Sequence, residues 1–413
     1  MKENDMKCRF CNSALHHTFA DLGMSPLANS YLSKKQAMQM EPFYPLHAYV
    51  CEKCFLVQLP MFETSENIFS DYAYFSSYAE SMLKHAKDYV DMVVARLELG
   101  TESRVVELAS NDGYLLQYFK EYSVPVLGIE PAQNVAEVAI QKGIPTSVKF
   151  FGVETAKELA REGKYADLML GNNVLAHVPD LNDFVAGMKI LLKPQGVITI
   201  EFPHLAVLMR DRLFDTIYHE HFSYFSFITV ERVFAAHGMT LFDVEEISTH
   251  GGSLRIYAKH TEDHSKTVST NVIQMREHEQ NAGYDGIDVY ENFAQEVIEV
   301  KRNILEFMID TKRQGKTIAA YGAPAKGNTL LNYCGIRSDM IDFTVDISPH
   351  KQNHFLPGVH IPIYAPERIK EEKPDYVVVL VWNLKDEVIK QMSYIREWGG
   401  KFVTLLPEVH ITD

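Results

Sequence analysis

Four side chains that could exchange protons stand in a row in the middle of this chain: Tyr218, His219, Glu220 and His221. Aromatic and apolar residues flank them, and partial burial beside other charges would tune their pKa values for acid and base catalysis. Adjacent residues of an extended segment point in different directions, so the four cannot all bind one metal ion. A surface loop with incidental histidines remains the alternative.

A second polar stretch, from Asn172 to His177, follows a short apolar run. It therefore lies just beyond the end of a predicted strand, where the active sites of open α/β sheets form. This stretch is a second candidate for the active site.

The segment from Val105 to Leu116 resembles motif I of the Rossmann-like methyltransferases. In that motif an acidic residue at a strand end, here Glu107, precedes a tight turn that lets the backbone approach S-adenosylmethionine (SAM). The segment departs from the glycine-rich pattern, because Ala109 and Asn111 replace two glycines and only Gly113 remains.

Two later strand ends add to the prediction of a SAM site. Glu130, followed by Pro131, ends the next apolar run, and a carboxylate there can accept both ribose hydroxyls of an adenosine. Asn172 and Asn173 end a further run. An NAD site is the alternative, but such sites usually carry G-x-G-x-x-G, which is absent from this region.

Two C-x-x-C pairs, Cys8 with Cys11 and Cys51 with Cys54, occur near the N-terminus. Each pair can present two thiolates from one turn, and four thiolates complete a closed tetrahedral zinc site. A closed site has no open position for substrate, so we expect a structural zinc ion. The lone Cys334 is expected in the core.

A glycine-containing turn, Gly322 to Thr329, joins a predicted strand to a predicted helix and includes Lys326. The turn would present N–H groups and a positive charge to an anion. It lacks the lysine that follows the second glycine of a P-loop, which disfavours ATP hydrolysis. Asp346 stands where an NAD-binding domain carries its ribose acid, so a nucleotide-sugar oxidoreductase using NAD(P) is the alternative function.

Apolar runs alternating with helical stretches predict two α/β units. The expected parallel strands are 105–108, 126–129, 168–170 and 197–200 in the first unit, and 318–321, 343–345, 376–381 and 402–405 in the second. A helix over 69–99 precedes the first unit, with Ala86, Tyr89 and Val93 on its apolar face. A long helix over 271–313 precedes the second.

The bulk composition excludes several classes of protein. The formal charge of −15 repels nucleic acid and anionic membranes, so we expect neither as a partner. We find no apolar run long enough for a transmembrane helix and no signal peptide. These features predict a cytoplasmic protein.

Six motifs in order along the chain are similar to those of the zinc-containing, SAM-dependent deoxysugar C-methyltransferases. They are the cysteine pairs, Ser110–Leu116, Asn172–His177, Tyr218–His221, His250–Arg255 and Tyr321–Asn332. The resemblance covers essentially the whole chain and implies methylation of C-3 in a TDP-linked 4-keto-deoxyhexose. It implies a small zinc-binding module (1–68), a central Rossmann-like class I methyltransferase domain with a helical linker (69–300) and a C-terminal Rossmann-like α/β domain that binds the nucleotide sugar (301–413). A monomer or a homodimer is expected.

The reaction requires a base for the proton next to the ketone and donors for the enolate oxygen. By resemblance His221 is the base, Tyr218 and His177 donate to the oxygen, and Glu220 orients and charge-tunes a neighbouring group. The sequence leaves open which of Tyr218 and His221 removes the proton.

The resemblance also implies which residues bind the two small molecules. The predicted cofactor-binding residues are Tyr72, Glu107, Ser110, Asn111, Asp112, Gly113, Glu130, Pro131, Asn172 and Asn173. The predicted substrate-binding residues are Gly251, Gly252, Ser253, Arg255, Gly322, Ala323, Lys326, Gly327 and Asn328.

Overall fold

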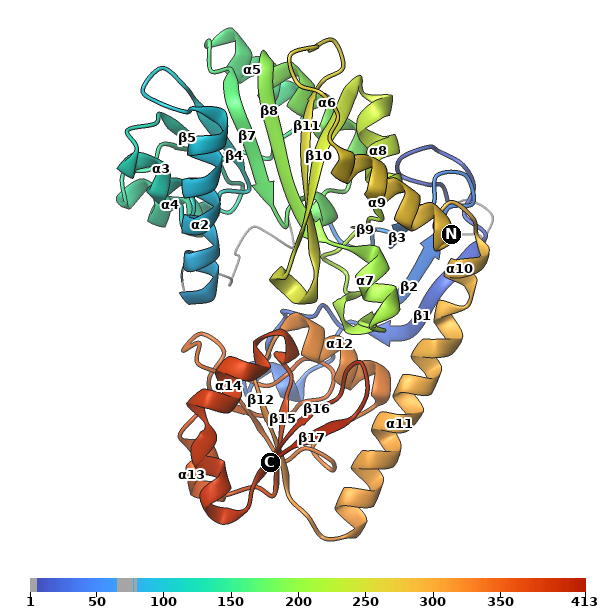
Figure 1. Cartoon of the computed structure of the whole chain (residues 1–413). Coiled ribbons are helices and arrows are strands. Elements are labelled where there is room, and N and C mark those ends of the chain that lie inside the picture. Colours follow the sequence, from blue (N-terminus) through green and yellow to red (C-terminus); the bar gives the residue numbers. More distant parts are fainter. Residues whose placement is uncertain (1–5, 65–76, 78–79) are drawn as a thin grey trace.

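The structure is a computed structural model that describes residues 6–64, 77 and 80–413. Three β-sheets organise the described chain, and Figure 1 shows a large sheet in the upper body, a second sheet in the lower body and a small one beside the junction. The predicted α/β class is confirmed.

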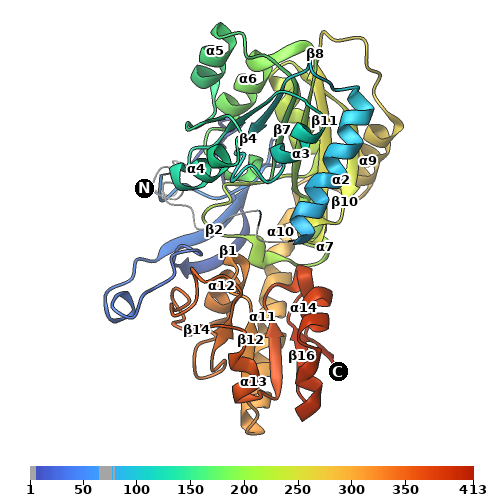
Figure 2. The same ribbon diagram turned by 90° about the vertical axis from the view of Figure 1, so that its left-hand side faces the viewer.

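The small N-terminal sheet is antiparallel throughout, in the order β1-β2-β3-β9. Its strands are β1 (His17–Ser25), β2 (Tyr44–Val50), β3 (Val57–Gln58) and β9 (Ser223–Tyr224). Because β9 comes from the middle of the chain, residues far beyond the predicted 1–68 module complete this sheet. Figure 2 shows β1 and β2 between the upper and lower bodies.

The central sheet has the order β10-β11-β8-β7-β4-β5-β6. Its strands are β4 (Val105–Leu108), β5 (Val126–Ile129), β6 (Thr146–Ser147), β7 (Ala166–Asn172), β8 (Leu192–Pro203), β10 (Met239–Ile247) and β11 (Ser253–His260). The four predicted strands of this unit are confirmed and parallel. The antiparallel strand β11 was not predicted; it lies between β8 and β10.

Helices cover both faces of the central sheet (Figures 1 and 2). Ala86, Tyr89 and Val93 of α2 are buried, as the predicted apolar stripe requires. The helices are α2 (Glu80–Leu97), α3 (Leu116–Glu121), α4 (Gln133–Gln141), α5 (Val153–Arg161), α6 (Leu181–Leu191), α7 (Leu205–Arg210) and α8 (Phe227–Ala236). Short 3-10 turns are η2 (Gln36–Met38), η4 (Leu175–His177), η5 (Phe214–Thr216) and η6 (Thr249–Gly251).

The C-terminal sheet has the order β14-β13-β12-β15-β16-β17. Its strands are β12 (Ile318–Tyr321), β13 (Thr344–Val345), β14 (Ile363–Tyr364), β15 (Tyr376–Val379), β16 (Lys401–Thr404) and β17 (His410–Thr412), and only β17 is antiparallel. The five parallel strands follow the Rossmann order. The helical elements are α12 (Ala325–Cys334), α13 (Arg368–Glu372), η7 (Trp382–Leu384), α14 (Lys385–Gln391) and η8 (Ser393–Trp398).

The predicted helix over 271–313 is interrupted. The structure has α9 (Thr270–Asn281), α10 (Asp288–Glu291) and α11 (Phe293–Arg313) in its place. Gly283, at φ +84°, and Gly286 lie in the break, and glycine favours such left-handed backbone.

The predicted domain boundary at 300/301 lies inside the continuous α11, so no linker separates the two units at that point.

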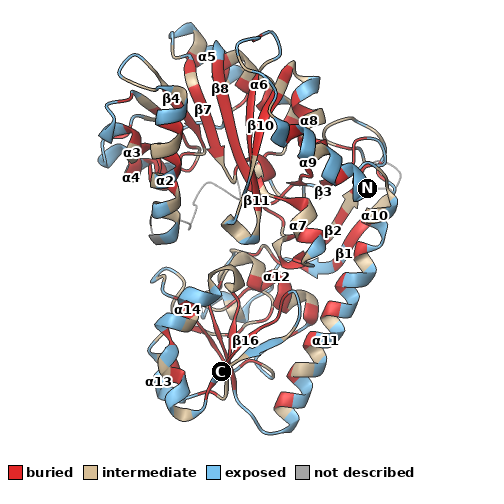
Figure 3. Ribbon diagram, viewed as in Figure 1, coloured by how far each residue is buried: buried red, intermediate tan, exposed pale blue. Residues whose placement is uncertain are grey.

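The N-terminal sheet shares its hydrophobic core with the C-terminal unit. Phe19 of β1 stacks on Phe293 of α11 with ring centroids 4.6 Å apart, and the same apolar cluster continues into Ile318 of β12. Buried residues make up most of the strands of the sheets in both bodies (Figure 3). In the part of the chain that the structure describes, no helix has the length and apolar character needed to cross a membrane.

Candidate active site

The predicted site residues gather where the carboxyl ends of the two large sheets face each other. In each sheet the chain order reverses next to the first parallel strand, between β4 and β7 above and between β12 and β15 below. Ligands of open α/β sheets bind at such reversals. The η6 turn of the upper body approaches η7 of the lower body, so the two reversal points share one region (Figure 1).

Tyr218 and His221 form a hydrogen-bonded pair in this region. The Tyr218 hydroxyl lies 2.8 Å from Nε2 of His221, and Nδ1 of His221 lies 3.0 Å from the Thr216 carbonyl oxygen. Since a carbonyl only accepts, Nδ1 carries the hydrogen and Nε2 accepts from the phenol. Burial, aided by His177, lowers the pKa of His221 well below its usual value, so the ring is neutral.

His177 packs edge-on against His221, with ring centroids 4.7 Å apart. Its Nδ1 donates to the Glu220 carbonyl oxygen at 2.8 Å, and burial lowers its pKa to about 4. In a neutral ring with the hydrogen on Nδ1, Nε2 can only accept. In this tautomer His177 is an acceptor at Nε2, whereas its predicted role was that of a donor to the enolate oxygen.

Glu220 is 4% exposed, and its carboxylate accepts a hydrogen bond from Asn29 Nδ2 at 2.7 Å. Burial raises the pKa of Glu220 to about 7, although the Asn29 bond opposes this shift.

The adjacent His219 has a different environment. Its Nε2 lies 3.2 Å from the Pro45 carbonyl oxygen of β2, and its ring packs edge-on against Tyr44.

The loop after β4 has the tight shape expected of motif I without its glycines. Ala109 and Asn111 adopt left-handed backbone at φ +54° and +48°. Gly113 has φ +75°, and a Cβ there would lie 3.0 Å from Ile144. The loop therefore retains the glycine-type conformation at two positions where the sequence departs from the pattern.

Glu130 fixes this loop with both oxygens, accepting from the backbone N–H groups of Asn111 and Ala132, each at 2.9 Å. Asp346 has the equivalent place in the C-terminal unit, where it accepts from Ala323 N and Ser348 N at 2.8 Å. Each carboxylate thus ties the loop after the first strand of its unit to the loop after the second. Pro131 continues the upper loop into α4.

Several buried polar atoms at the upper strand ends have no hydrogen-bond partner among the described residues. They are Glu107 Oε2, Ser110 Oγ, Asp112 Oδ1, Asn172 Oδ1 and Asn173 Oδ1. Unpaired buried polar atoms are costly, so their concentration indicates a polar ligand. Donors and acceptors around this loop fit the methionine and ribose groups of SAM. Tyr72 lies outside the described residues.

The structure adds His250, which no predicted role included. Asn173 Nδ2 donates to its Nε2 at 3.0 Å, and both residues have left-handed backbone, at φ +55°. Strained non-glycine residues of this kind cluster at functional sites. Burial and the nearby charge of Lys326 lower the pKa of His250 to about 4. Its position inside the motif 250–255 was the only sequence signal.

The predicted anion loop of the C-terminal unit lies at the end of β12 and the start of α12. Gly322, at φ +92°, makes room for Val381, and Gly327 makes room for Leu380. Lys326 donates to Asn383 Oδ1, and burial lowers its pKa to about 8. Asn328 is buried and donates to the Ala28 carbonyl oxygen at 2.6 Å.

Asp215 and Trp382, also outside the predicted set, connect the two bodies. Trp382 Nε1 donates to Asp215 Oδ2 at 2.7 Å, and the Lys326 ammonium lies 4.1 Å from the centre of the indole ring. Burial raises the pKa of Asp215 to about 6. A Cβ on Gly251 would lie 2.6 Å from the indole, so this glycine permits the contact.

The predicted substrate residues from Gly252 to Arg255 contact other parts of the protein. Arg255 is paired at 2.6 Å with Glu201 and at 2.8 Å with Glu245, so two carboxylates already neutralise the guanidinium expected to bind phosphate. Ser253 donates to the Thr249 carbonyl oxygen at 2.9 Å and closes its own turn. Gly252 gives space to Val207.

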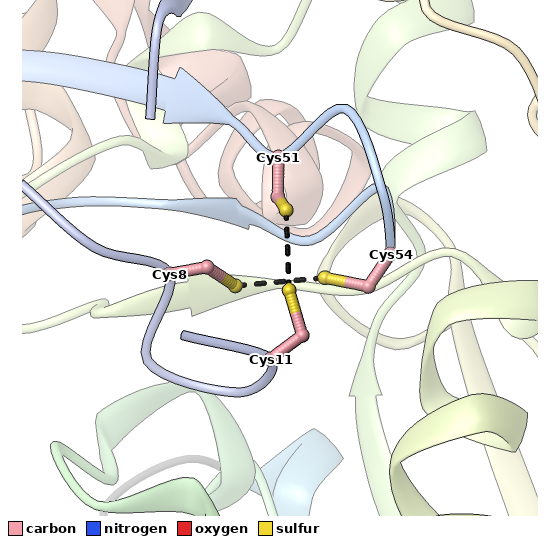
Figure 4. A group of neighbouring side chains, drawn as sticks. All are labelled: Cys8, Cys11, Cys51 and Cys54. Carbon is pink, nitrogen blue, oxygen red and sulfur yellow. Dashed lines mark hydrogen bonds between the residues drawn. The ribbon is translucent and has the colours of Figure 1, made fainter. Parts of the chain in front are cut away.

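The four cysteines meet as predicted, with all Sγ atoms within 4.8 Å of one another (Figure 4). Two of the Sγ pairs are Cys11–Cys51 at 3.4 Å and Cys8–Cys54 at 3.5 Å. A tetrahedral ion with Zn–S bonds of about 2.3 Å requires sulfur separations of about 3.8 Å, so the cluster fits zinc after a small expansion.

Comparison with known proteins agrees with this arrangement. Three family models match successive stretches: "Putative zinc binding domain" over 8–69, "Methyltransferase domain" over 80–244 and "C-methyltransferase C-terminal domain" over 248–407. The chain is 35% identical over 406 residues to C-methyltransferase NovU of Streptomyces niveus, covering 98% of this chain and 96% of that protein. The chain belongs to the C-methyltransferase family. This assignment replaces the oxidoreductase alternative.

This C-methyltransferase is SAM-dependent and has an N-terminal zinc-binding domain. A shorter match is to the ubiquinone biosynthesis O-methyltransferase of Bartonella tribocorum, 28% identical over 98 residues, which are 24% of this chain and 40% of that protein. Among solved structures, the magnesium protoporphyrin IX methyltransferase of Synechocystis PCC 6803 with bound SAM is 16% identical, covers 47% of this chain and 88% of that chain, and has a TM-score of 0.33.

Proposed function

We propose that this C-methyltransferase methylates the carbon next to the ketone of a nucleotide-linked 4-keto-deoxysugar, at C-3. The observation that carries the proposal is the pair formed by Tyr218 and His221, a hydroxyl donor 2.8 Å from a neutral imidazole nitrogen. A ketone oxygen and the hydrogen on the neighbouring carbon require one donor and one base at such close spacing.

The proposed reaction begins when the Tyr218 hydroxyl turns from His221 Nε2 to the ketone oxygen. This exposes the Nε2 lone pair, which takes the proton of the neighbouring carbon. The C–H electron pair moves into the enolate, whose oxygen accepts the Tyr218 hydrogen bond. SAM, when bound, would supply the methyl group for the new C–C bond and leave as S-adenosylhomocysteine. Protonated His221 then gives this proton to water after the methylated sugar is released.

Glu220 and His177 have supporting roles in this proposal. An ionised Glu220 would stabilise the positive charge that His221 acquires, and its pKa of about 7 makes that ionisation sensitive to pH near neutrality. His177, an acceptor at Nε2, suits a hydroxyl group of the sugar rather than the enolate oxygen.

The two ligands would lie at the two reversal points. We assign SAM to the loops after β4, β5 and β7, with the residues predicted above, and to His250 beside Asn173. We assign the nucleotide diphosphate to the loop from Gly322 to Asn328. The positive charge of Lys326 and the N–H groups at the start of α12 support this assignment, and a TDP-linked sugar remains the favoured substrate.

Mass spectrometry of reactions with SAM and a panel of TDP-, GDP- and UDP-linked 4-keto-deoxysugars tests the proposal. We expect one methyl group on a keto-sugar, absent without SAM. In heavy water, deuterium should enter the same carbon when S-adenosylhomocysteine replaces SAM, because deprotonation precedes transfer. Methylation without such exchange would contradict the enolate route and favour transfer to oxygen or nitrogen.

A further inference from the structure

A short segment of the N-terminal part, Ala28 to Leu32, contacts both large units. Asn328 of α12 donates to the Ala28 carbonyl oxygen at 2.6 Å, and Leu32 exchanges backbone hydrogen bonds of 3.0 and 2.8 Å with Phe355. The Tyr31 hydroxyl donates to the Ala323 carbonyl oxygen at 2.6 Å. The segment is therefore fixed on the loop that we assign to the diphosphate.

Within this segment, Asn29 points to the other unit. Its Nδ2 donates to Glu220 Oε1 at 2.7 Å, and its Oδ1 lies 3.2 Å from the Tyr31 hydroxyl. Ala323, Tyr31, Asn29 and Glu220 thus form one chain of contacts. It runs from the C-terminal loop to the carboxylate of Glu220, the residue that precedes His221 in the chain.

The zinc-binding end of the same module is anchored on the central unit. Asn182 Nδ2 of α6 donates to the carbonyl oxygens of Arg9 and Phe10 at 3.2 and 3.0 Å. Thr229 Oγ1 of α8 donates to the Cys54 carbonyl oxygen at 3.2 Å. A module attached at both ends can hold Asn29 in place with little freedom.

We propose that Asn29, supplied by the zinc-binding module, is a positioning residue for methyl transfer. Asn29 fixes the Glu220 side chain, favours its ionised form and links it through Tyr31 to the diphosphate loop. The proposal rests on the function proposed above, because that function gives Glu220 its part in the reaction. It also gives the zinc-binding module a part in catalysis beyond folding.

The physical basis of this proposal is that the Glu220 carboxylate has few other hydrogen-bond donors. Among the described residues, Asn29 is the side-chain donor to the Glu220 carboxylate. A buried carboxylate without a donor is strongly disfavoured, so removing the amide should favour the protonated, neutral form. The direction of the pKa effect agrees, since the Asn29 bond lowers the pKa that burial raises.

Other titratable groups surround Glu220 and are present in the wild type and in the variants at positions 29 and 30. They are Tyr31 with Lys351 and Asp346 behind it, His177, whose Nδ1 donates to the Glu220 carbonyl oxygen, and the neighbours Tyr218, His219 and His221. Substitution at Asn29 leaves these side chains in place, and of them Tyr31 also loses a contact in Asn29→Ala, because its hydroxyl lies 3.2 Å from Asn29 Oδ1.

The test compares the full-length wild-type enzyme with Asn29→Ala, Asn29→Asp and Ser30→Ala. The aspartate keeps the size of the side chain and loses the donor, and the exposed Ser30 next to it is the matched control. Infrared titration follows the protonated carboxyl band of Glu220, identified by its loss in Glu220→Gln. This readout needs no turnover. Zinc content and melting temperature show whether each variant is folded.

We expect the Glu220 midpoint to rise by about one pH unit in both Asn29 variants and to stay unchanged in Ser30→Ala. With a methylatable keto-sugar, kcat at pH 7 should fall about fivefold, recover towards pH 9 as Glu220 ionises, and leave the KM for SAM unchanged. Tyr31→Phe should give a smaller loss of the same kind.

An unchanged midpoint, or a loss of kcat that is equal at every pH, would overturn the proposal and make Asn29 a packing residue only. Failure of the wild-type enzyme to methylate any keto-sugar would refute the proposed function instead. In that case the infrared midpoint still decides whether Asn29 controls the ionisation of Glu220.

Discussion

Tyr218 donates its hydroxyl hydrogen to Nε2 of His221 across 2.8 Å, while the opposite nitrogen of that ring is fixed on the Thr216 carbonyl oxygen. The tautomer of His221 is thereby determined by a backbone group of the preceding 3-10 turn, η5. The basic nitrogen of the site is covered by a phenol that can also serve as a donor to substrate. This arrangement makes the two residues separable by experiment.

Replacing His221 with Asn should lower kcat about 10²- to 10⁴-fold, the usual contribution of a general base, and abolish deuterium exchange at the sugar carbon. Tyr218→Phe should lower kcat about 10²- to 10³-fold through loss of the oxyanion donor, with exchange slowed and still measurable. His219→Asn, whose ring faces Pro45, is the control and should stay close to wild type. Exchange that survives in His221→Asn and disappears in Tyr218→Phe would make Tyr218 the base.

Glu220 should make the stability of the protein depend on pH. Its pKa rises from 4.5 to about 7 on folding, so below pH 4.5 both states are protonated. As the pH rises through this window the unfolded state ionises first, and the free energy of unfolding falls by about 3 kcal/mol. Glu220→Gln should therefore have a higher melting temperature than wild type at pH 8, and no such advantage near pH 4.5. An equal advantage at both values would show that the carboxyl ionises as freely in the folded protein as in the unfolded one.

Removing the zinc ligands should unfold the N-terminal module. Zinc contributes about 10–16 kcal/mol to small zinc domains, and Cys8, Cys51 and Cys54 lie in a core shared with the central unit. Cys51→Ser should reduce bound zinc, measured by atomic emission, together with the melting temperature and activity. Cys334→Ser, which changes a buried thiol distant from the cluster in sequence, should retain full zinc. Retention of zinc and stability in Cys51→Ser would contradict a structural site.

The contact between Gly251 of the upper body and Trp382 of the lower body should be disrupted by the addition of one methyl group. Alanine at Gly251 would place its Cβ 2.6 Å from Trp382, whereas alanine at Gly315, also at positive φ, meets no atom within 4 Å. Both substitutions cost about 1–3 kcal/mol in backbone strain, so the extra loss in Gly251→Ala measures the contact. We expect lower activity and a shifted Trp382 fluorescence in that variant only, read in a Trp398→Phe background. Equal effects of the two alanines would show that the indole moves aside freely.

Buried parallel strands were the most predictable part of the fold. The runs Val105–Leu108 and Ile318–Tyr321 are β4 and β12, because strands covered on both faces are apolar at every position. Strand β11 was missed, since it carries Arg255 and Lys259 among its buried residues, and their charges obscure the apolar pattern. The helix before the C-terminal unit was predicted as continuous. Because α9 is polar on most of its surface, its apolar pattern does not mark where this helix ends.

The sequence by itself determined the four-thiolate cluster, the SAM-type loop and the row of titratable residues, because each depends on close neighbours along the chain. The tertiary structure alone decided which of these groups meet. Asn29 and Glu220 are 191 positions apart, and Asp215 and Trp382 are 167 positions apart. It also neutralised Arg255 with two carboxylates and placed the hydrogen of His177 on Nδ1. Hydrogen bonds and charge pairs of this kind arise only when segments that are distant in sequence come together in the fold, so no local pattern records them.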